Sequence, residues 1–277
     1  MSAREAVSRA GRSHATAVAP RDGSVTNVAV REPQRFGTIV VVGGGCYGSY
    51  YVRQLGRARR AGALHWQRLV VVDRDPGCRV AIEPQSDAPE IVVRAWDDFF
   101  ATYLADAVAH TESSALDAIV PSPLMPHLLF DWLVSRARTR YAPRRVHVRP
   151  LATDPAVPWQ RRSPNGETHY VSFAEWMCPI NCIEPVRCPA TREARNWTMP
   201  AALADHVAAE RAAGHILDGP IVFHCAHRAY GVGMIDVRDV VAADRRIAEA
   251  ADHGPADFLI GTVSHCHGAL GVMSIAS

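Results

Sequence analysis

The chain has 277 residues, of which 48% are hydrophobic and 21% charged, a composition typical of a globular protein with one large domain or two smaller ones. Its formal net charge is +2, and all 30 basic residues are arginines. This balance indicates neither nucleic acid nor a membrane surface as a partner, and no apolar run approaches the roughly 20 residues of a membrane-spanning helix. Without lysine, Schiff-base chemistry and a P-loop lysine are excluded.

Seven cysteines and 13 histidines stand out against this background. An odd cysteine count without a secretory signal argues against a disulfide framework. We therefore expect a cytoplasmic protein whose clustered cysteines bind a metal or do redox work. A homo-oligomer is compatible with these features, and a small molecule is the expected substrate.

Residues 1–36 are rich in Ala, Ser, Arg and Val and carry no helical stripe, so we expect a disordered tail. Continuous apolar runs then predict buried parallel strands. These runs lie at 38–42, 69–73, 91–93 and 118–120. Helices are expected after Gly48, from Asp97, and from Leu124 to Arg136. This alternation predicts an α/β, Rossmann-like doubly wound parallel sheet over residues 37–145.

Residues 146–277 are predicted to form a second α/β part, rich in Cys and His. Prolines, glycines and the Asn165-Gly166 pair predict loops and one hairpin before the cysteine-rich segment. After that segment, apolar periodicity predicts two helices and two strands, which together include a second βαβ unit. The helices lie at 200–213 and 237–251, and the strands at 221–223 and 258–263.

The first predicted strand runs into a glycine-rich turn, Gly43-x-Gly45-x-x-Gly48, which opens the first helix. Gly43 permits a tight turn, Gly45 lets the backbone approach a pyrophosphate, and Gly48 allows close packing of helix and strand. The helix N-terminus then attracts the phosphates. Asp73, at the end of the second strand, is placed to bond an adenosine ribose, while Arg74 beside it leaves NADP open as well as NAD.

On these residues, the segment from about 37 to 140 resembles the NAD(P)-binding Rossmann superfamily. The resemblance implies a dinucleotide site at Gly43, Gly45, Gly48 and Asp73, and it implies no particular substrate. A methyltransferase that places S-adenosylmethionine at the same turn remains an alternative.

Three cysteines, Cys178, Cys182 and Cys188, share a segment with three prolines. Because proline prevents regular backbone pairing, this segment needs another organiser, and a metal bound by three thiolates supplies one. The Cys-Pro steps favour an iron–sulfur cluster, with zinc as the alternative.

The carboxyl ends of parallel strands open on one edge of a sheet, and two predicted strands run there into Cys/His pairs. Cys266 is therefore the predicted fourth ligand, with Cys225 or His265 as alternatives. Weaker catalytic candidates are His127, His265 and His267.

Together these features predict an NAD(P)-binding oxidoreductase with a thiolate-ligated iron–sulfur cluster or metal that acts on a small molecule. Two other classes stay open. One is a nucleotide-binding sensor or scaffold protein with a structural zinc or cluster site, and the other is a non-redox metalloenzyme or methyltransferase.

Overall fold

The computed structural model describes residues 32–277, apart from 85–86, 175–177 and 181, and residues 32–277 form one compact unit. Most of the predicted tail lies outside the described residues. Its boundary at residue 36 is wrong, however, because the first strand already begins at Gln34. Gln34 to Phe36 pair in register with Leu64 to Trp66, and Phe36 is buried in the core.

The first sheet, sheet A, has the strand order β3-β2-β1-β4-β10-β9. Its strands are β1 (Gln34–Val42), β2 (Leu64–Asp73), β3 (Glu90–Val93), β4 (Ala118–Val120), β9 (Ala226–Ala229) and β10 (Val232–Asp236). The four strands from the first half of the chain are parallel, as predicted. β10 then pairs antiparallel with β4, and β9 with β10. Sheet A is therefore mixed and takes strands from both halves of the chain.

The second sheet, sheet B, has the order β6-β7-β12-β11-β8, and β5 also pairs with β12. Its strands are β5 (Val146–Arg149), β6 (Trp159–Arg162), β7 (His169–Ser172), β8 (Asp218–His224), β11 (Ala256–Val263) and β12 (His267–Ile275). β8 and β11 are parallel, as the predicted βαβ unit requires, and β6 and β7 form the predicted hairpin. The remaining pairs are antiparallel, so sheet B is also mixed.

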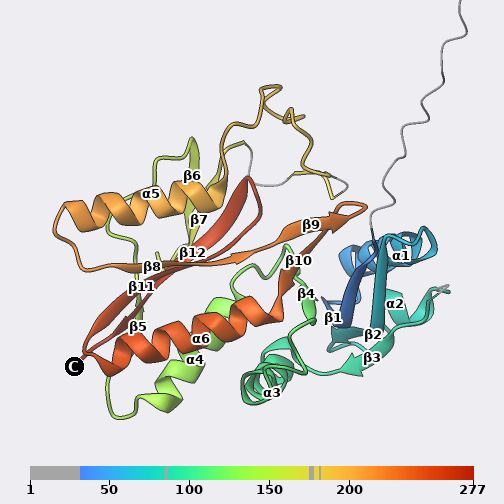
Figure 1. Cartoon of the computed structure of the whole chain (residues 1–277), viewed down its shortest axis with the longest axis horizontal. Coiled ribbons are helices and arrows are strands. Elements are labelled where there is room, and N and C mark those ends of the chain that lie inside the picture. Colours follow the sequence, from blue (N-terminus) through green and yellow to red (C-terminus); the bar gives the residue numbers. More distant parts are fainter. Residues whose placement is uncertain (1–31, 85–86, 175–177, 181) are drawn as a thin grey trace, which may run out of the picture. The chain divides into compact units, whose positions relative to one another are not determined.

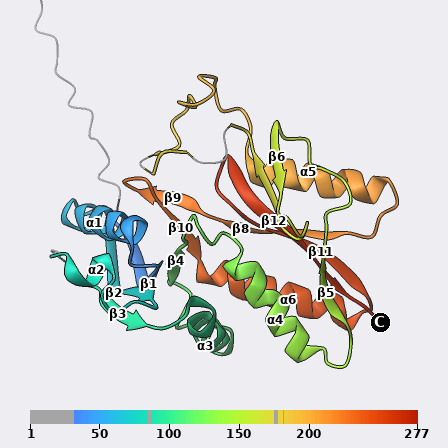
Figure 2. The same cartoon turned by 180° about the vertical axis from the view of Figure 1, so that it is seen from behind.

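The described residues form six helices, which cover both faces of the two sheets (Figures 1 and 2). They are α1 (Cys46–Arg60), α2 (Arg79–Ile82), α3 (Trp96–Ala109), α4 (Leu128–Arg140), α5 (Met199–Ala212) and α6 (Val237–Asp252). Helix α4 begins later than predicted, because prolines shape the segment that follows β4. No helix in the described ranges is both long and apolar enough to cross a membrane.

Three apolar clusters hold these layers together. The first joins one face of sheet A, through α3, α4 and α6, to one face of sheet B. The second lies between α1 and the opposite face of sheet A, and the third between α5 and the opposite face of sheet B. The mixed α/β class is therefore confirmed, and the first cluster makes the two sheets parts of one packed structure. The predicted division between residues 145 and 146 stays a prediction.

A group of polar side chains is buried between α5 and sheet B. His169 on β7 and His206 on α5 are 3% and 8% exposed. Nδ1 of His169 lies 3.7 Å from Asp154 Oδ1, and one ring nitrogen of each histidine has no hydrogen-bond partner among the described residues. Burial lowers the pKa of both imidazoles. For His169, Asp154 opposes that shift, whereas Arg162 and His206 add to it.

We therefore expect the free energy of unfolding to fall as the pH drops from neutral through about 6.5, the ordinary histidine pKa. Below that pH the unfolded chain takes up protons that the folded chain resists, so this stability is complete above pH about 6.5 and is lost toward the lowered folded-state pKa. Melting temperatures would report the loss at roughly 2–4 °C per kcal/mol. His169→Gln should flatten the profile, whereas His110→Gln, at an exposed histidine, should leave its slope unchanged. Equal slopes in both variants would contradict this assignment.

Candidate functional site

A cavity of about 150 Å³ lies where segments following β1, β4, β8 and β11 meet the loop before α5. Tyr47 and Tyr51 of α1 contribute to its wall, and prolines after β4 form another part. In sheet A the chain places β2 on one side of β1 and β4 on the other, so the strand order reverses between β1 and β4. Open α/β sheets bind ligands at such switch points, beyond the carboxyl ends of the strands.

The glycine turn, residues 43–48, borders this region. Gly43 has a φ of +86°, a conformation that favours glycine, and its N–H donates to the Val72 carbonyl at 2.9 Å. A Cβ on Gly48 would lie 1.8 Å from the Gly43 oxygen, so close packing demands glycine there. A Cβ on Gly45 would meet nothing within 4 Å. The backbone geometry of the turn therefore requires glycine at positions 43 and 48, whereas the space beside Gly45 is free.

Asp73 shapes the same turn. One carboxylate oxygen accepts the Gly44 N–H at 2.6 Å, and the other accepts the Asp75 N–H at 3.0 Å. Arg74 is exposed and lies 3.8 Å from Asp97. Asp73 thus has a structural role that the sequence did not reveal. Its contact with a ribose, and the choice between NAD and NADP, stay predictions.

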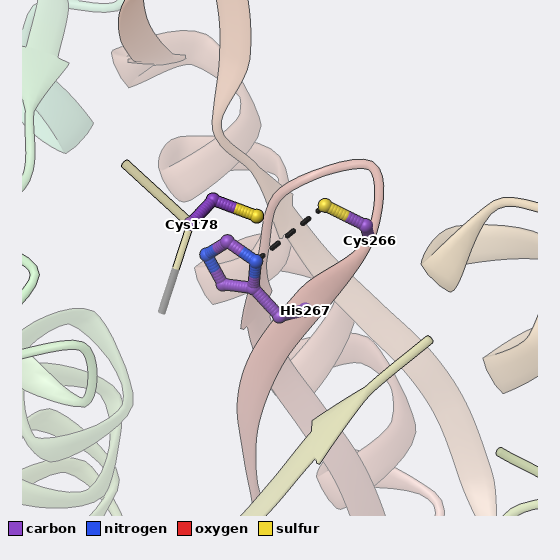
Figure 3. Close-up of side chains that lie close together, drawn as sticks. All are labelled: Cys178, Cys266 and His267. Atoms are coloured by element: carbon purple, nitrogen blue, oxygen red, sulfur yellow. Dashed lines mark hydrogen bonds between the residues drawn. The ribbon is translucent and has the colours of Figure 1, made fainter. Parts of the chain in front are cut away.

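Three potential metal ligands meet beside the cavity: Cys178, Cys266 and His267 (Figure 3). We call these three residues the sulfur group. Their ligand atoms all lie within 4.8 Å of one another, and Cys266 Sγ is 3.5 Å from His267 Nδ1. Cys178 comes from the loop between β7 and α5, Cys266 from the turn that follows β11, and His267 is the first residue of β12. Two of the four predicted thiolate ligands, Cys178 and Cys266, thus lie side by side.

The two thiols differ in their readiness to ionise. A hydrogen bond from Cys178, assisted by His267 and Ser264 and opposed by burial, lowers the pKa of Cys266 to about 4. The same hydrogen bond, together with burial, raises the pKa of Cys178. This environment favours the thiolate at Cys266 and the thiol at Cys178. Because metals bind the thiolate form, Cys266 is prepared to be a ligand.

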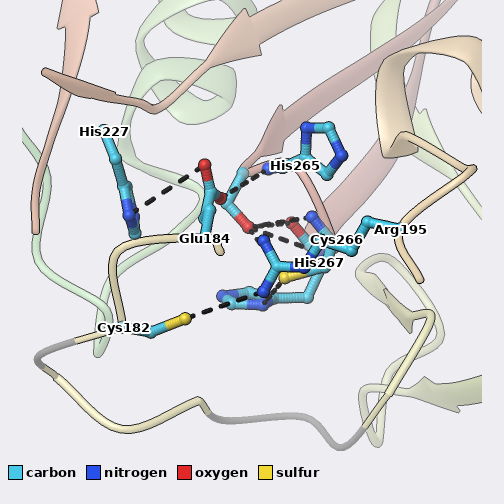
Figure 4. Close-up of polar contacts among 8 residues, drawn as sticks. Cys182, Glu184, Arg195, His227, His265, Cys266 and His267 are labelled. Atoms are coloured by element: carbon cyan, nitrogen blue, oxygen red, sulfur yellow. Dashed lines mark hydrogen bonds and ion pairs between the residues drawn. The ribbon is translucent and has the colours of Figure 1, made fainter. Parts of the chain in front are cut away.

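Cys182 and Cys188 lie near this group but outside it. Cys182 lines the cavity, and its sulfur accepts a hydrogen bond from Arg195 Nη2 at 3.7 Å (Figure 4). Cys188 is fully buried, and N–H donors from Thr191 and Ala190, together with Arg195, lower its pKa against the effect of burial. The predicted set of Cys178, Cys182, Cys188 and Cys266 thus stays a prediction.

Both alternatives for the fourth ligand occupy other environments. Cys225 lines the cavity, but burial, with Glu184 adding to it, raises the pKa of Cys225 to about 12, which disfavours the thiolate. The His265 ring lies at a tilt of 45° to the Trp197 ring, with the ring centroids 6.1 Å apart. Among the catalytic candidates, His267 joins the sulfur group, whereas His127 precedes α4, and its Nε2 lies 3.9 Å from Asp131.

Several other residues of the cavity wall were not identified from the sequence as functional candidates. Tyr47 and Tyr51 have the helical spacing of core residues, yet both line the cavity. Glu184 and His227 also line it, and Glu184 Oε2 lies 4.0 Å from His227 Nδ1. A carboxylate between two cysteines of a proline-rich segment was the available signal for Glu184. Its inward direction depends on tertiary structure.

The donor set fits a transition-metal ion. Two sulfurs and one imidazole nitrogen are the ligands that zinc and similar soft or borderline metals prefer. A tetrahedral ion held by three protein ligands retains one position for water or substrate. The neighbouring cavity gives that position access to a small molecule.

Comparison with known protein families gives a match to the second half of the chain. Residues 129–276 match a family model described as "Uncharacterized protein, C-terminal domain". The matched region runs from α4 to the end of β12 and includes every donor of the sulfur group. Neither the curated proteins nor the solved structures contain a match.

Proposed function

Because the chain belongs to the AF_1314_C family, whose description names no activity, we propose a function from the chemistry of the cavity. The protein is an NAD(P)-dependent oxidoreductase that holds a metal ion at Cys178, Cys266 and His267 and acts on a small molecule. One observation carries the proposal: two sulfur donors and one imidazole meet beside a cavity at the switch point between the parallel strands β1 and β4.

The cofactor assignment has its own support. The parallel strands run in the order β3-β2-β1-β4, and a glycine turn joins β1 to α1. NAD(P)-binding Rossmann proteins have this strand order and place a pyrophosphate at such a turn. Free space beside Gly45 is compatible with a close phosphate.

A single metal ion also agrees with hydride chemistry. When bound, it supplies Lewis acidity that polarises a carbonyl or hydroxyl oxygen. Cys178, Cys266 and His267 would hold it, while Tyr51 and the prolines after β4 restrict water around the substrate. Nicotinamide transfers two electrons as a hydride, and a Lewis acid does not change its own oxidation state. No one-electron relay is then required.

A second candidate is an oxidoreductase with an iron–sulfur cluster on Cys178, Cys182, Cys188 and Cys266. The environment of Arg195 favours it. The guanidinium contacts Cys182, whereas its Nε and Nη1 are buried and have no hydrogen-bond partner among the described residues. A buried cation needs negative charge nearby, and sulfur ligands of a cluster accept such N–H groups.

Metal analysis of anaerobically purified protein distinguishes these candidates. We expect one zinc or similar ion per chain without acid-labile sulfide, and NADH or NADPH binding by calorimetry. Iron together with sulfide would establish the second candidate. Protein without bound metal that also fails to take up zinc would refute both metal assignments. Binding of S-adenosylmethionine but of neither dinucleotide would refute the cofactor assignment. Cofactor binding without turnover would instead favour a sensor.

A further inference from the structure

Two segments far apart in the sequence must be held together to form the metal site. Cys178 belongs to the Cys loop, residues 178–195 without the undescribed residue 181, and Cys266 and His267 belong to the turn at 264–267. The ends of the connection are fixed by main-chain hydrogen bonds. Phe173 N–H donates to the Cys266 carbonyl at 2.9 Å, and Met199 N–H donates to the His265 carbonyl at 2.8 Å.

The middle of the Cys loop reaches the turn through Glu184. Its Oε1 accepts the His265 N–H at 3.1 Å, next to the two donors of the turn. Figure 4 shows Glu184 between His227 and His265, with Cys182 on the same loop. This hydrogen bond acts on the main chain of the residue before Cys266, so it positions the donors without occupying them.

The backbone of Glu184 indicates that this contact is specifically maintained. Its φ of +52° lies in the left-handed region, which residues with a Cβ seldom adopt. Such conformations persist where surrounding interactions impose them, and they concentrate at functional sites. The side chain is 15% exposed, so the carboxylate is largely withdrawn from water. The strained backbone directs this carboxylate toward the turn and the cavity.

We propose that Glu184 is the positioning residue of the metal site, which holds the Cys loop so that Cys178 stays within coordination distance of Cys266 and His267. The proposal rests on the proposed function for the presence of a metal. It requires a hydrogen-bond acceptor at position 184 and no negative charge, because the partner is a main-chain N–H. Glutamine should therefore replace glutamate, whereas alanine should not.

Cobalt titration tests the positioning. Thiolate-to-cobalt charge-transfer absorption reports the number of sulfur ligands. Glu184→Ala should bind Co²⁺ at least about tenfold more weakly, which is the lower end of the effect of losing an outer-shell partner. The intensity of its charge-transfer absorption should be reduced as in Cys178→Ser. Glu184→Gln should retain wild-type intensity and affinity. Glu193→Ala, at an exposed carboxylate of the same loop, is the matched control and should do the same.

A second measurement needs no metal. In metal-free protein, diamide oxidises two thiols to a disulfide, taking both hydrogens onto its N=N bond. Peptide mapping gives the joining rate, which is the rate at which Cys178 and Cys266 form a disulfide. We expect this disulfide to form more slowly in Glu184→Ala than in the wild type, Glu184→Gln or Glu193→Ala. Circular dichroism would confirm that each variant is folded.

The outcomes separate the two proposals. If the wild type binds no cobalt, but its Cys178–Cys266 disulfide forms faster than that of Glu184→Ala, the metal site is refuted and the positioning role is supported. Wild-type affinity, intensity and joining rate in Glu184→Ala would overturn the positioning role alone. A Glu184→Gln variant as defective as Glu184→Ala would also overturn it, since the acceptor would then not be the cause.

Discussion

Cys266→Ser is expected to abolish stoichiometric metal binding. Cys266 is 1% exposed, and its sulfur lies within 4.8 Å of the ligand atoms of Cys178 and His267. Of the two cysteines of this group, it is the one whose pKa is lowered. Serine has nearly the same shape but is a much poorer ligand for soft metals. Because metal binding contributes to folding free energy, the metal-dependent part of the thermal stability should vanish as well.

The measurement is metal content per chain by elemental analysis, paired with melting curves with and without a chelator. Cys46→Ser is the control, since Cys46 is exposed and stands outside the sulfur group. In the control, the chelator should lower the melting temperature as in the wild type. A Cys266→Ser protein with full metal content would place the site elsewhere. Loss of metal in Cys225→Ser instead would identify the alternative ligand.

Substitutions in the glycine turn should have the second large effect: one at Gly48 should destabilise the fold, whereas one at Gly45 should leave the fold stable and weaken cofactor binding. Gly48→Ala would place a Cβ 1.8 Å from the Gly43 carbonyl oxygen, a main-chain atom that cannot move without disturbing β1. We expect a loss of about 4 kcal/mol or more in unfolding free energy, the range reserved for severe steric conflicts. Gly45→Val meets open space and should leave the fold intact.

Calorimetry with NADH and NADPH then separates fold from ligand binding. Gly45→Val should bind the dinucleotide at least about tenfold more weakly, because its side chain occupies the space expected for the pyrophosphate. Chemical denaturation should show little change in this variant and a large one in Gly48→Ala. Unchanged cofactor affinity in Gly45→Val would mean that no pyrophosphate lies against this turn.

The first half of the fold was largely predictable because its strands are continuous β-branched runs. Val40 and Val41 are fully buried, on opposite faces of β1, and such a strand has a clear signal. β12 was missed because glycines interrupt its apolar pattern. Gly271 exists for a tertiary reason: a Cβ there would lie 2.6 Å from the Phe130 ring, which comes from α4. No local pattern contains that information.

The candidate site divides in the same way. The position of Cys266 at the carboxyl end of β11 follows from topology, whereas the position of Cys178 beside it depends on the path of an irregular loop. The selection of His267 as third donor depends on side-chain geometry within a four-residue turn. The spacing of the cysteines favoured a metal centre, but it did not indicate which of Cys182, Cys188 or His267 would complete the ligand set.

The hairpin of β9 and β10 has a consequence for the chain as a folding unit. Both strands come from the region of the family match, yet they complete the sheet that carries the glycine turn. A fragment ending near residue 145 would leave β4, only three residues long, as an unpaired edge open to aggregation. The first half of the chain therefore depends on the second half for its solubility. A protein that contained residues 34–145 alone would need another strand to pair with the free edge of β4.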